Sequence, residues 1–549
     1  MKIGFKLIIS VLISVIIFGS TVQGQIENTP HDLSAVSGGN ACSFCHTPHG
    51  AVLGTPLWNH KLSEAVYNIY QSSSLEANVG QPTGSSKLCL SCHDGTVALT
   101  QTITNGSGGG SYIKPGAANL GTDLSDDHPI SFVYSPALAV EDNQLRSPLA
   151  LPEQLKLDKT SELQCTTCHD AHNNQYGNFL VMPNRQSRLC VSCHNLNGWI
   201  SSIHAVSTTT SSVADDTYLQ NSEYETLSEN GCLNCHRPHS AGGHERLLHF
   251  SKLEENCLDC HDGSVTLTDI KTDLSKISSH DVTKYQDIHD PRESPTLSVM
   301  HVECVDCHNP HTTKNGPARA PVVPGAMQNV SGETILGSPT QQVQYEYEVC
   351  FKCHGDNPNR IRSIITRQIT QTNTRLEFDP SNPSFHPVVS SGVNQNVPSL
   401  ISPMTVASII YCMDCHSSDS SSTARGPHGS IYQYLLAWRY ETSDFTQESS
   451  FSYELCYKCH SRNSILNDES FTKHKEHLDE QIPCSACHDP HGISTAQGTR
   501  LNNSHLINFD ISIVQADPTT GRLEFEDTGV FHGRCYLKCH NKTHSPGDY

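Results

Sequence analysis

One spacing of cysteine and histidine recurs along the whole 549-residue chain. Eleven segments read C-x-x-C-H, with two residues between the cysteines and a histidine directly after the second cysteine. A twelfth segment, CYLKCH, carries one residue more between its cysteines, and together the motifs use all 24 Cys of the chain. In chain order the motif residues are Cys42, Cys45 and His46; Cys89, Cys92 and His93; Cys165, Cys168 and His169; Cys190, Cys193 and His194; Cys232, Cys235 and His236; Cys257, Cys260 and His261; Cys304, Cys307 and His308; Cys350, Cys353 and His354; Cys412, Cys415 and His416; Cys456, Cys459 and His460; Cys484, Cys487 and His488; and Cys535, Cys539 and His540.

C-x-x-C-H is the attachment motif of c-type haem. Two thiols on one turn can add to the two vinyl groups of one porphyrin, and the adjacent imidazole is then held beneath the iron. A disulfide framework would not need a histidine after every second cysteine, and a structural zinc wants four Cys or His ligands. The sequence therefore predicts about twelve covalent haem c groups, with the 24 cysteines as attachment sites and the motif histidines as iron ligands.

The composition agrees with an interior that is not built from side chains alone. Only 36% of the residues are hydrophobic, against about 45–50% in average globular proteins on a slightly different residue set. After removal of residues 1–24, 525 residues would serve twelve motifs, about 44 for each. That is too little chain to enclose every haem separately, so we expect haems packed against one another, short α-helices around the motifs, long coil and little β-structure. Residues 505–526 alternate in polarity and predict a β-hairpin that turns at 518–521.

Two further groups of histidines are candidates for the second axial position of each iron. The first group follows the odd-numbered motifs as a C-H-x-P-H-like extension, displaced to GPHG at the ninth motif: His49, His172, His239, His311, His428 and His491. Residues three apart share one face of a helical turn, so His49 cannot bind the iron that His46 binds and would reach a neighbouring one. The second group lies upstream of each pair of motifs: His31, His128, His204, His280, His386, and His474 or His477.

These two groups supply twelve distal ligands, so the sequence predicts that every iron is bound by two imidazoles. Nine histidines remain as spares: His60, His244, His249, His289, His301, His505, His532, His544 and one of His474 and His477. Methionine does not recur in the pattern. Histidine–methionine ligation would raise the reduction potential, so the pattern favours low-potential haems.

The N-terminus has the features of an export signal. Lys2 and Lys6 precede the apolar run 7–18, and Val22 and Gly24 are small or apolar residues at plausible −3 and −1 positions. The run is about 12 residues, short of the roughly 20 that span a bilayer, so we expect a signal peptide at 1–24 rather than a membrane anchor. The chain has 56 acidic and 35 basic residues. This balance argues against a nucleic-acid partner, because proteins that bind nucleic acids present a basic surface.

Internal repeats indicate a modular chain. CLSCHDGTVALT at 89–100 nearly matches CLDCHDGSVTLT at 257–268, and YEVCFKCH at 347–354 matches YELCYKCH at 453–460. By the same comparison CYLKCH is CYKCH with Leu537 inserted. We therefore expect six modules of two motifs each after the signal peptide, with bounds at 25–120, 121–203, 204–271, 272–379, 380–470 and 471–549.

The doubled motifs and the C-H-x-P-H extension resemble those of the multihaem c-type cytochromes, over nearly the whole chain that follows the signal. The resemblance implies electron transfer through a chain of stacked haems that are mostly bound by two histidines. It implies a periplasmic, cell-surface or extracellular location, and as partners other redox proteins or extracellular electron acceptors. A homopolymer or an outer-membrane complex is the kind of assembly that such proteins form.

The alternative activity is a multihaem reductase of nitrogen or sulfur oxyanions. Such an enzyme needs one iron with an open position, and some use lysine in place of the motif histidine. C-x-x-C-K does not occur in this sequence, and enough histidines exist to close every site. The sequence therefore favours an electron-transfer protein without a catalytic residue. The two hypotheses differ in whether one iron binds an added ligand.

Overall fold

The computed structural model describes residues 26–549, except 38–39, 53–54, 105–109, 212–216, 221, 285–300, 358–362 and 421–423. The predicted signal peptide and the spare His289 lie outside the described residues. The chain divides into two units, of which unit 1 holds residues 1–196 and 235–251 and unit 2 holds residues 197–234 and 252–549. Each unit is described by itself.

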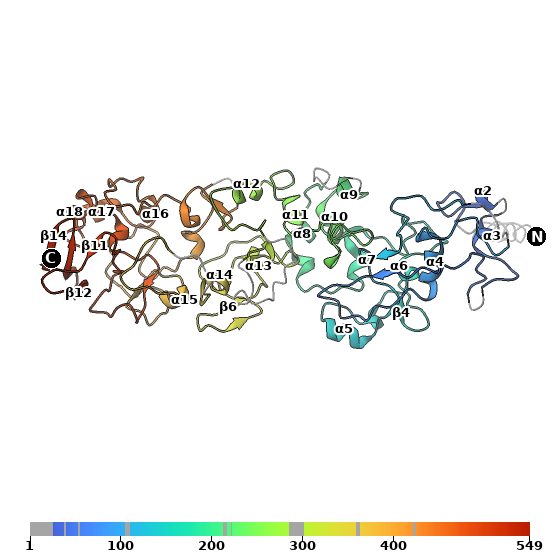
Figure 1. Ribbon diagram of the computed structural model, residues 1–549, viewed down its shortest axis with the longest axis horizontal. Helices are drawn as coiled ribbons and strands as arrows, with labels where there is room; N and C mark the ends of the chain where they lie inside the picture. Colours follow the sequence, from blue (N-terminus) through green and yellow to red (C-terminus); the bar gives the residue numbers. More distant parts are fainter. Residues whose placement is uncertain are drawn as a thin grey trace, which may run out of the picture. The chain divides into compact units, whose positions relative to one another are not determined.

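Unit 1 is coil interrupted by helices of one to three turns and by two-residue strands (Figure 1). Its α- and 3₁₀-helices are α2 Ser34–Ser37, α3 Ala41–Cys45, α4 Gly84–His93, α5 Pro136–Asp142, η1 Pro148–Ala150, α6 Cys165–Cys168, η2 Arg185–Ser187, α7 Arg188–Val191 and η5 Glu245–Leu247. Its strands are β1 Asn68–Ile69, β2 Asp123–Leu124, β3 Phe132–Val133 and β4 Glu162–Leu163. β1 pairs with β2 in parallel, and β3 pairs with β4 antiparallel.

Unit 2 has the same character along most of its length (Figure 1). Its helices are η3 Trp199–Ser201, α8 Ile203–Val206, α9 Thr217–Gln220, α10 Leu227–Asn230, η4 Gly231–Asn234, α11 Glu255–Leu258, α12 Ile270–Leu274, α13 Cys304–Cys307, η6 Gly325–Met327, α14 Glu346–His354, α15 Thr374–Glu377, η7 Cys412–Asp414, η8 Gln433–Leu435, α16 Glu454–Tyr457, α17 Arg462–Leu466, α18 His474–Asp479 and η9 Cys484–Ala486. Its strands are β5 Ser278–Ser279, β6 Gly332–Glu333, β7 Pro339–Thr340, β8 Ser384–Phe385, β9 Gly429–Ser430, β10 Gly492–Ile493, β11 Val514–Gln515, β12 Glu524–Gly529, β13 His532–Cys539 and β14 Lys542–Asp548. The two-residue strands form the pairs β5–β9, β8–β10 and β6–β7.

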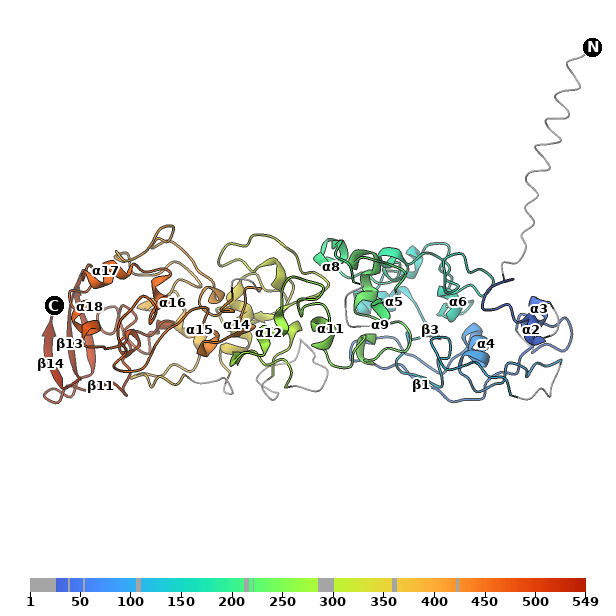
Figure 2. The same cartoon turned by 90° about the horizontal axis from the view of Figure 1, so that it is seen from above.

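A four-stranded sheet at the C-terminus is the largest regular element among the described residues. β13 pairs antiparallel with β11, β12 and β14, and the path runs β11–β13–β12 with β14 joined to β13 (Figure 2). The predicted turn exists, because the N–H of Gly521 donates to the carbonyl of Asp517 at 2.8 Å. The predicted hairpin is wrong in its pairing, since β13 lies between the two strands that the turn connects.

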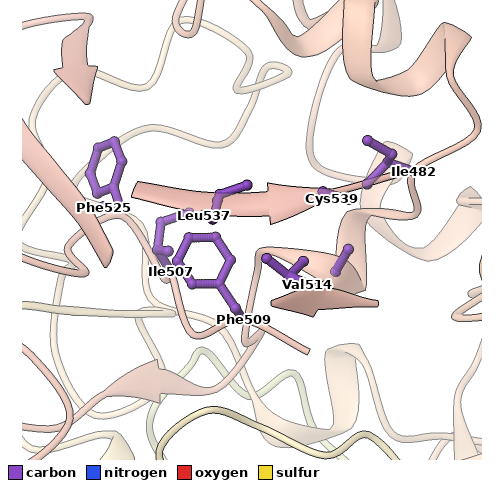
Figure 3. Packing of buried hydrophobic residues seen from close by; sticks show 8 residues of the cluster. Ile482, Ile507, Phe509, Val514, Phe525, Leu537 and Cys539 are labelled. Atoms are coloured by element: carbon purple, nitrogen blue, oxygen red, sulfur yellow. The ribbon is translucent and has the colours of Figure 1, made fainter. Parts of the chain in front are cut away.

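Side chains alone form only small cores. The largest cluster among the described residues is that of the C-terminal sheet: Ile482, Ala486, Ile507, Phe509, Val514, Phe525, Leu537 and Cys539 (Figure 3). The other clusters hold no more than five buried residues each. The prediction of mostly coil with short helices and little β-structure is thereby confirmed. No described helix combines the length and the apolar character needed to cross a bilayer.

Candidate haem-binding sites

Most C-x-x-C-H motifs form a single helical turn that their own sequence closes. At the seventh motif the N–H of Glu303, directly before the first cysteine, donates to the Asp306 carboxylate at 2.9 Å, and the third and ninth motifs have the same arrangement. The turn ends where the N–H of His308 donates to the carbonyl of Cys304 at 3.0 Å. Such reciprocal capping stabilises the first turn of a helix. The capped turn therefore holds two thiols and one imidazole close together within a short segment of the chain.

A carbonyl farther along the chain orients the imidazole of each odd-numbered motif. In the six bonds Nδ1 is the donor, because a carbonyl oxygen can only accept. Nε2 is then left with its lone pair free for a metal. The bonds run from His46 to Pro56 (2.8 Å), His169 to Asn178 (2.8 Å), His236 to Arg246 (2.8 Å), His308 to Ala326 (2.9 Å), His416 to Tyr434 (2.7 Å) and His488 to His505 (3.2 Å).

Most motif histidines face a second imidazole across a gap of constant width. Within the described parts of the units ten motif histidines do so, and His477 and His544 form an eleventh pair without a motif histidine; the ring centroids lie 6.0 to 6.5 Å apart. The pairs are His31–His93, His46–His172, His128–His194 and His169–His239 in unit 1, and His204–His261, His280–His354, His308–His428, His386–His460, His416–His491, His474–His488 and His477–His544 in unit 2.

This gap fits one iron bound from both sides. A metal–imidazole bond is about 2 Å long, so two imidazoles on one metal place their ring centres about 6 Å apart. Rings in van der Waals contact would stack much closer, as His31 does on Phe179 at 4.2 Å. In unit 2 the eighth to twelfth motifs line one continuous and mostly apolar cavity of about 2860 Å³, whereas a pocket for one drug-sized ligand holds about 300–1,000 Å³. The donor set and the space both fit haem c.

Before the last module, the facing pairs follow one rule of chain order. In the last module, His488 instead faces the upstream His474, and His477 faces His544. The histidine of an even-numbered motif faces the upstream histidine of its own predicted module, as His93 faces His31. The histidine of an odd-numbered motif faces the extension histidine of the next module, as His46 faces His172. In four cases the second of two neighbouring modules thus supplies an imidazole that faces a motif histidine of the first. The helix at the first motif ends at Cys45 and the backbone of His46 is extended, so His46 and His49 do not share the helical turn that their spacing suggested.

Backbone contacts hold the upstream histidine of one module beside the extension histidine of the next module. The upstream histidine donates from Nδ1 to the carbonyl of the residue directly before the extension histidine. The strand pairs β5–β9 and β8–β10 lie beside two of these contacts, where Ser279 is opposite Gly429 and Phe385 is opposite Gly492. The contacts are His31–Ala171 (3.3 Å), His204–Pro310 (2.9 Å), His280–Pro427 (2.8 Å) and His386–Pro490.

Buried carboxylates contact Nδ1 of two extension histidines. His239 Nδ1 lies 2.9 Å from Oδ1 of Asp127, and His491 Nδ1 lies 3.2 Å from Oε2 of Glu377. Both carboxylates are less than a tenth exposed. A carboxylate partner raises the basicity of a ligating imidazole more than a carbonyl does. Some distal histidines are thus carbonyl-bonded and two are carboxylate-bonded, whereas Nδ1 of His428 and His474 has no hydrogen-bond partner among the described residues.

Burial keeps these imidazoles neutral. It lowers the pKa of His194, His261, His416 and His460 to about 4, with neighbouring imidazoles adding to the effect. Burial likewise raises the pKa of the Cys92 thiol to about 12. A neutral imidazole is the form that binds a metal, so protonation does not compete with the ligand role at neutral pH.

Cysteines of successive motifs are neighbours throughout each unit. The Cys89 and Cys165 thiols lie within hydrogen-bonding reach of each other, and the same holds for Cys257 and Cys304. The other neighbouring pairs influence each other's pKa through space. The links join the first motif to the fourth and the sixth to the twelfth without a gap: Cys45–Cys92, Cys89–Cys165, Cys168–Cys193, Cys257–Cys304, Cys307–Cys350, Cys350–Cys412, Cys415–Cys459, Cys456–Cys484 and Cys487–Cys535.

Several histidines differ from the sequence expectation. His49 is exposed, and no imidazole faces it among the described residues, whereas both His474 and His477 face a partner. His544, classed as a spare, faces His477, while His540 does not take part in a facing pair within the described part of unit 2. The fifth motif spans the division between the units, so the predicted ligand roles of His236 and His311 stay predictions.

Two features could not be found from the motifs. One is the set of carbonyls that orient the odd-motif imidazoles. Its sequence signal is weak and consists of a large apolar residue one position after each carbonyl, such as Leu57 and Phe179, both of which have positive φ. The other is the pair of buried carboxylates, Asp127 and Glu377, which occupy unrelated positions in the sequence.

Comparison with known proteins places the motifs in a family. The family described as "Doubled CXXCH motif" matches residues 159–197 and 225–266, which hold the third to sixth motifs. The chain is a multihaem c-type cytochrome. In this cytochrome a second family, described as "Cytochrome c554 and c-prime", matches residues 411–489, which hold the ninth to eleventh motifs.

A curated multiheme cytochrome matches part of the chain. The cytochrome is 30% identical over 206 residues to the multiheme cytochrome MtrA of Shewanella baltica (strain OS185). The match covers 35% of this chain and 43% of the relative's length. The chain thus spans less than half the length of this relative.

Proposed function

We propose that this cytochrome transfers electrons between redox partners through about twelve covalently bound haem c groups. The observation that carries the proposal is the set of facing imidazoles at a constant 6.0 to 6.5 Å. When bound, haem c supplies an iron that changes between two oxidation states. The facing histidines would hold that iron from both sides and would leave no position for a substrate at these sites.

The order of the sites supports transfer along the chain. Neighbouring cysteines connect each motif to the next, from the first to the fourth in unit 1 and from the sixth to the twelfth in unit 2. The residues that would hold successive groups are therefore adjacent. The groups would follow one another in space in the same order as their motifs follow one another in the chain. The imidazoles are held in place and stay neutral, so the surrounding side chains need to move little when the charge at a site changes.

The partners and the location are part of the proposal. The predicted signal peptide at 1–24 supports export, and the similarity to a multiheme cytochrome supports a role in respiratory or extracellular electron transfer. The acidic balance of the chain, 56 acidic against 35 basic residues, favours a basic donor protein or a cationic oxidised metal as acceptor through electrostatic steering.

Ligand binding separates this function from that of a reductase. We expect the oxidised holoprotein to be entirely low-spin by electron paramagnetic resonance. The reduced holoprotein should not bind carbon monoxide, and its mass should exceed that of the exported chain by twelve haems. One high-spin iron that binds carbon monoxide would instead favour reduction of a nitrogen or sulfur oxyanion. A colourless mature protein would overturn both functions.

A further inference from the structure

The twelfth motif does not fold like the other motifs. Its cysteines lie on strand β13, whose alternation places Cys535, Leu537 and Cys539 on one face. Leu537 and Cys539 are buried in the cluster of the C-terminal sheet, which Figure 3 shows. All three residues line the cavity of unit 2. His540 follows the end of β13 and begins the turn to β14 with a positive φ, so the motif histidine lies outside the strand face that carries the two thiols.

His540 is held by other partners. Its Nε2 lies 2.8 Å from Oδ1 of Asp444, and its ring stacks on Phe445 with centroids 4.5 Å apart and planes within 8°. Nε2 is the nitrogen that the odd-motif histidines leave free for a metal. His540 is not among the residues that line the described cavity. The imidazole next to the second cysteine is thus turned towards a carboxylate instead of the cavity.

Strand β14 supplies another imidazole at the same place. His544 lies opposite Leu537 in the β13–β14 register, and its ring faces His477 with centroids 6.4 Å apart and planes within 22°. His477 donates from Nδ1 to the carbonyl of Lys473 at 2.6 Å, which leaves its Nε2 for a metal. Both rings line the cavity that Cys535 and Cys539 line. The separation matches that of the other facing pairs.

Helix α18 carries ligands for two neighbouring sites. His474 and His477 are three residues apart and so share one face of the helix, where His474 faces His488 of the eleventh motif. The helix is fixed to β14 by an ion pair of Glu476 Oε1 and Lys542 Nζ at 2.5 Å. The same helix therefore holds an imidazole towards the eleventh site and another towards the twelfth.

We propose that the iron of the haem attached at the twelfth motif is bound by His477 and His544, and that His540 is not its ligand. The proposal rests on the proposed function, because it takes haem c as the group that the cysteines hold. The inserted Leu537 turns the usual helical turn into a strand, and the ligand moves from the residue directly after the second cysteine to the fifth residue after it.

Three single variants of the full-length, matured holoprotein test the proposal: His544→Gly, His477→Gly and His540→Gly. We expect His544→Gly and His477→Gly each to convert one iron, about one twelfth of the total haem, from low-spin to high-spin. That fraction should bind carbon monoxide when reduced, and added imidazole should restore the low-spin signal. His540→Gly is the matched control and should leave the spin state unchanged.

A second variant covers the case in which glycine prevents folding. His544→Met keeps a ligand at the site, and we expect it to show the spectral signature of a methionine–iron bond at one haem. A high-spin iron in His540→Gly, with none in His544→Gly, would overturn the proposal. A wild-type mass with only eleven haems, all low-spin, would also overturn it while leaving the electron-transfer function standing.

Discussion

The distal histidines differ in the partner of Nδ1. His31 and His204 donate to carbonyls, whereas His239 and His491 contact the buried carboxylates of Asp127 and Glu377. A carboxylate makes the imidazole a stronger electron donor, and a stronger donor stabilises the oxidised iron. The haems at the third and ninth motifs should therefore have lower potentials than they would with carbonyl partners.

Replacement of Asp127 tests this difference. In Asp127→Asn the amide accepts a weaker hydrogen bond, so we expect the potential of the third haem to rise and the most negative part of the reductive titration to lose about one haem in twelve. Spectroelectrochemical titration of the holoprotein measures the change. Asp126→Asn removes the same charge one residue away and serves as the control. An equal rise in both variants would attribute the effect to net charge.

His60 is a buried histidine without a ligand role in the facing pairs. Its side chain is fully buried between Phe44 and Trp58, and neither ring nitrogen has a hydrogen-bond partner among the described residues. Burial lowers its pKa to about 4. The unfolded chain, with a pKa near 6.5, takes up the proton first, so the stability of this region should fall as the pH drops from 6.5 towards 4.

We expect His60→Phe to remove that pH dependence and to stabilise the region. An unpaired buried polar group costs about 1–3 kcal/mol, and phenylalanine fills a similar space beside two aromatic rings. Amide hydrogen exchange of the surrounding backbone at pH 7 and pH 4.5, in wild type and variant, measures both effects. A loss of protection in the variant at pH 7 would show that His60 has a polar partner in the holoprotein.

At the scale of elements, two-residue strands determine where the distal ligands lie. Gly492 of β10 approaches the backbone so closely that an added Cβ would lie 2.1 Å from the Glu377 carbonyl oxygen. The strand pair β8–β10 places His386 and His491 directly beside it. Glycine is required at this position because no side chain fits between the two backbones.

We expect Gly492→Ala to push β10 away from the Glu377 carbonyl at the end of α15 and from Phe385 of β8, and so to displace His491 and His386 together. The ninth and tenth irons would then lose a ligand, which would appear as a high-spin fraction of up to about two haems in twelve. Electron paramagnetic resonance of the oxidised holoprotein measures it. Gly392→Ala is the control, because its Cβ would meet only ordinary contact at 3.7 Å. A fully low-spin Gly492→Ala would contradict the role of the strand pair.

The sequence predicts the motif turns well because each is local. Two cysteines, a capping side chain such as Asp306 and the following histidine lie within one turn, so spacing alone determines the arrangement. The partner of each histidine is not local, since His46 faces a residue in the next module. The twelfth site shows the limit most clearly, because the inserted Leu537 changes helix to strand and the motif spacing carries no information about His544.

For the whole molecule, the contacts between motifs define a single file within each unit. Each cysteine contact described above joins consecutive motifs. In a single file each motif neighbours only the motif before it and the motif after it. One missing haem in the interior of the file should therefore interrupt electron transfer more than one missing at its end.

Removal of the ninth haem tests the single file. We expect the current through a single holoprotein between two electrodes to fall more in Cys412→Ser/Cys415→Ser than in Cys42→Ser/Cys45→Ser, which removes the first haem. Both variants should carry eleven haems by mass. Equal currents in the two variants would show that electrons have an alternative route.

The supply of a ligand by the following module also sets an order of maturation. His46 meets His172 only after more than a hundred further residues have emerged. A polypeptide exported from its N-terminus would complete each odd-numbered iron late, when the succeeding segment arrives. Chains released prematurely would end in a half-built centre that is open to oxygen. The segment 471–549 escapes this dependence, because α18 provides His474 to face His488 from within it. Further modules could therefore be inserted before this segment without leaving an iron incomplete.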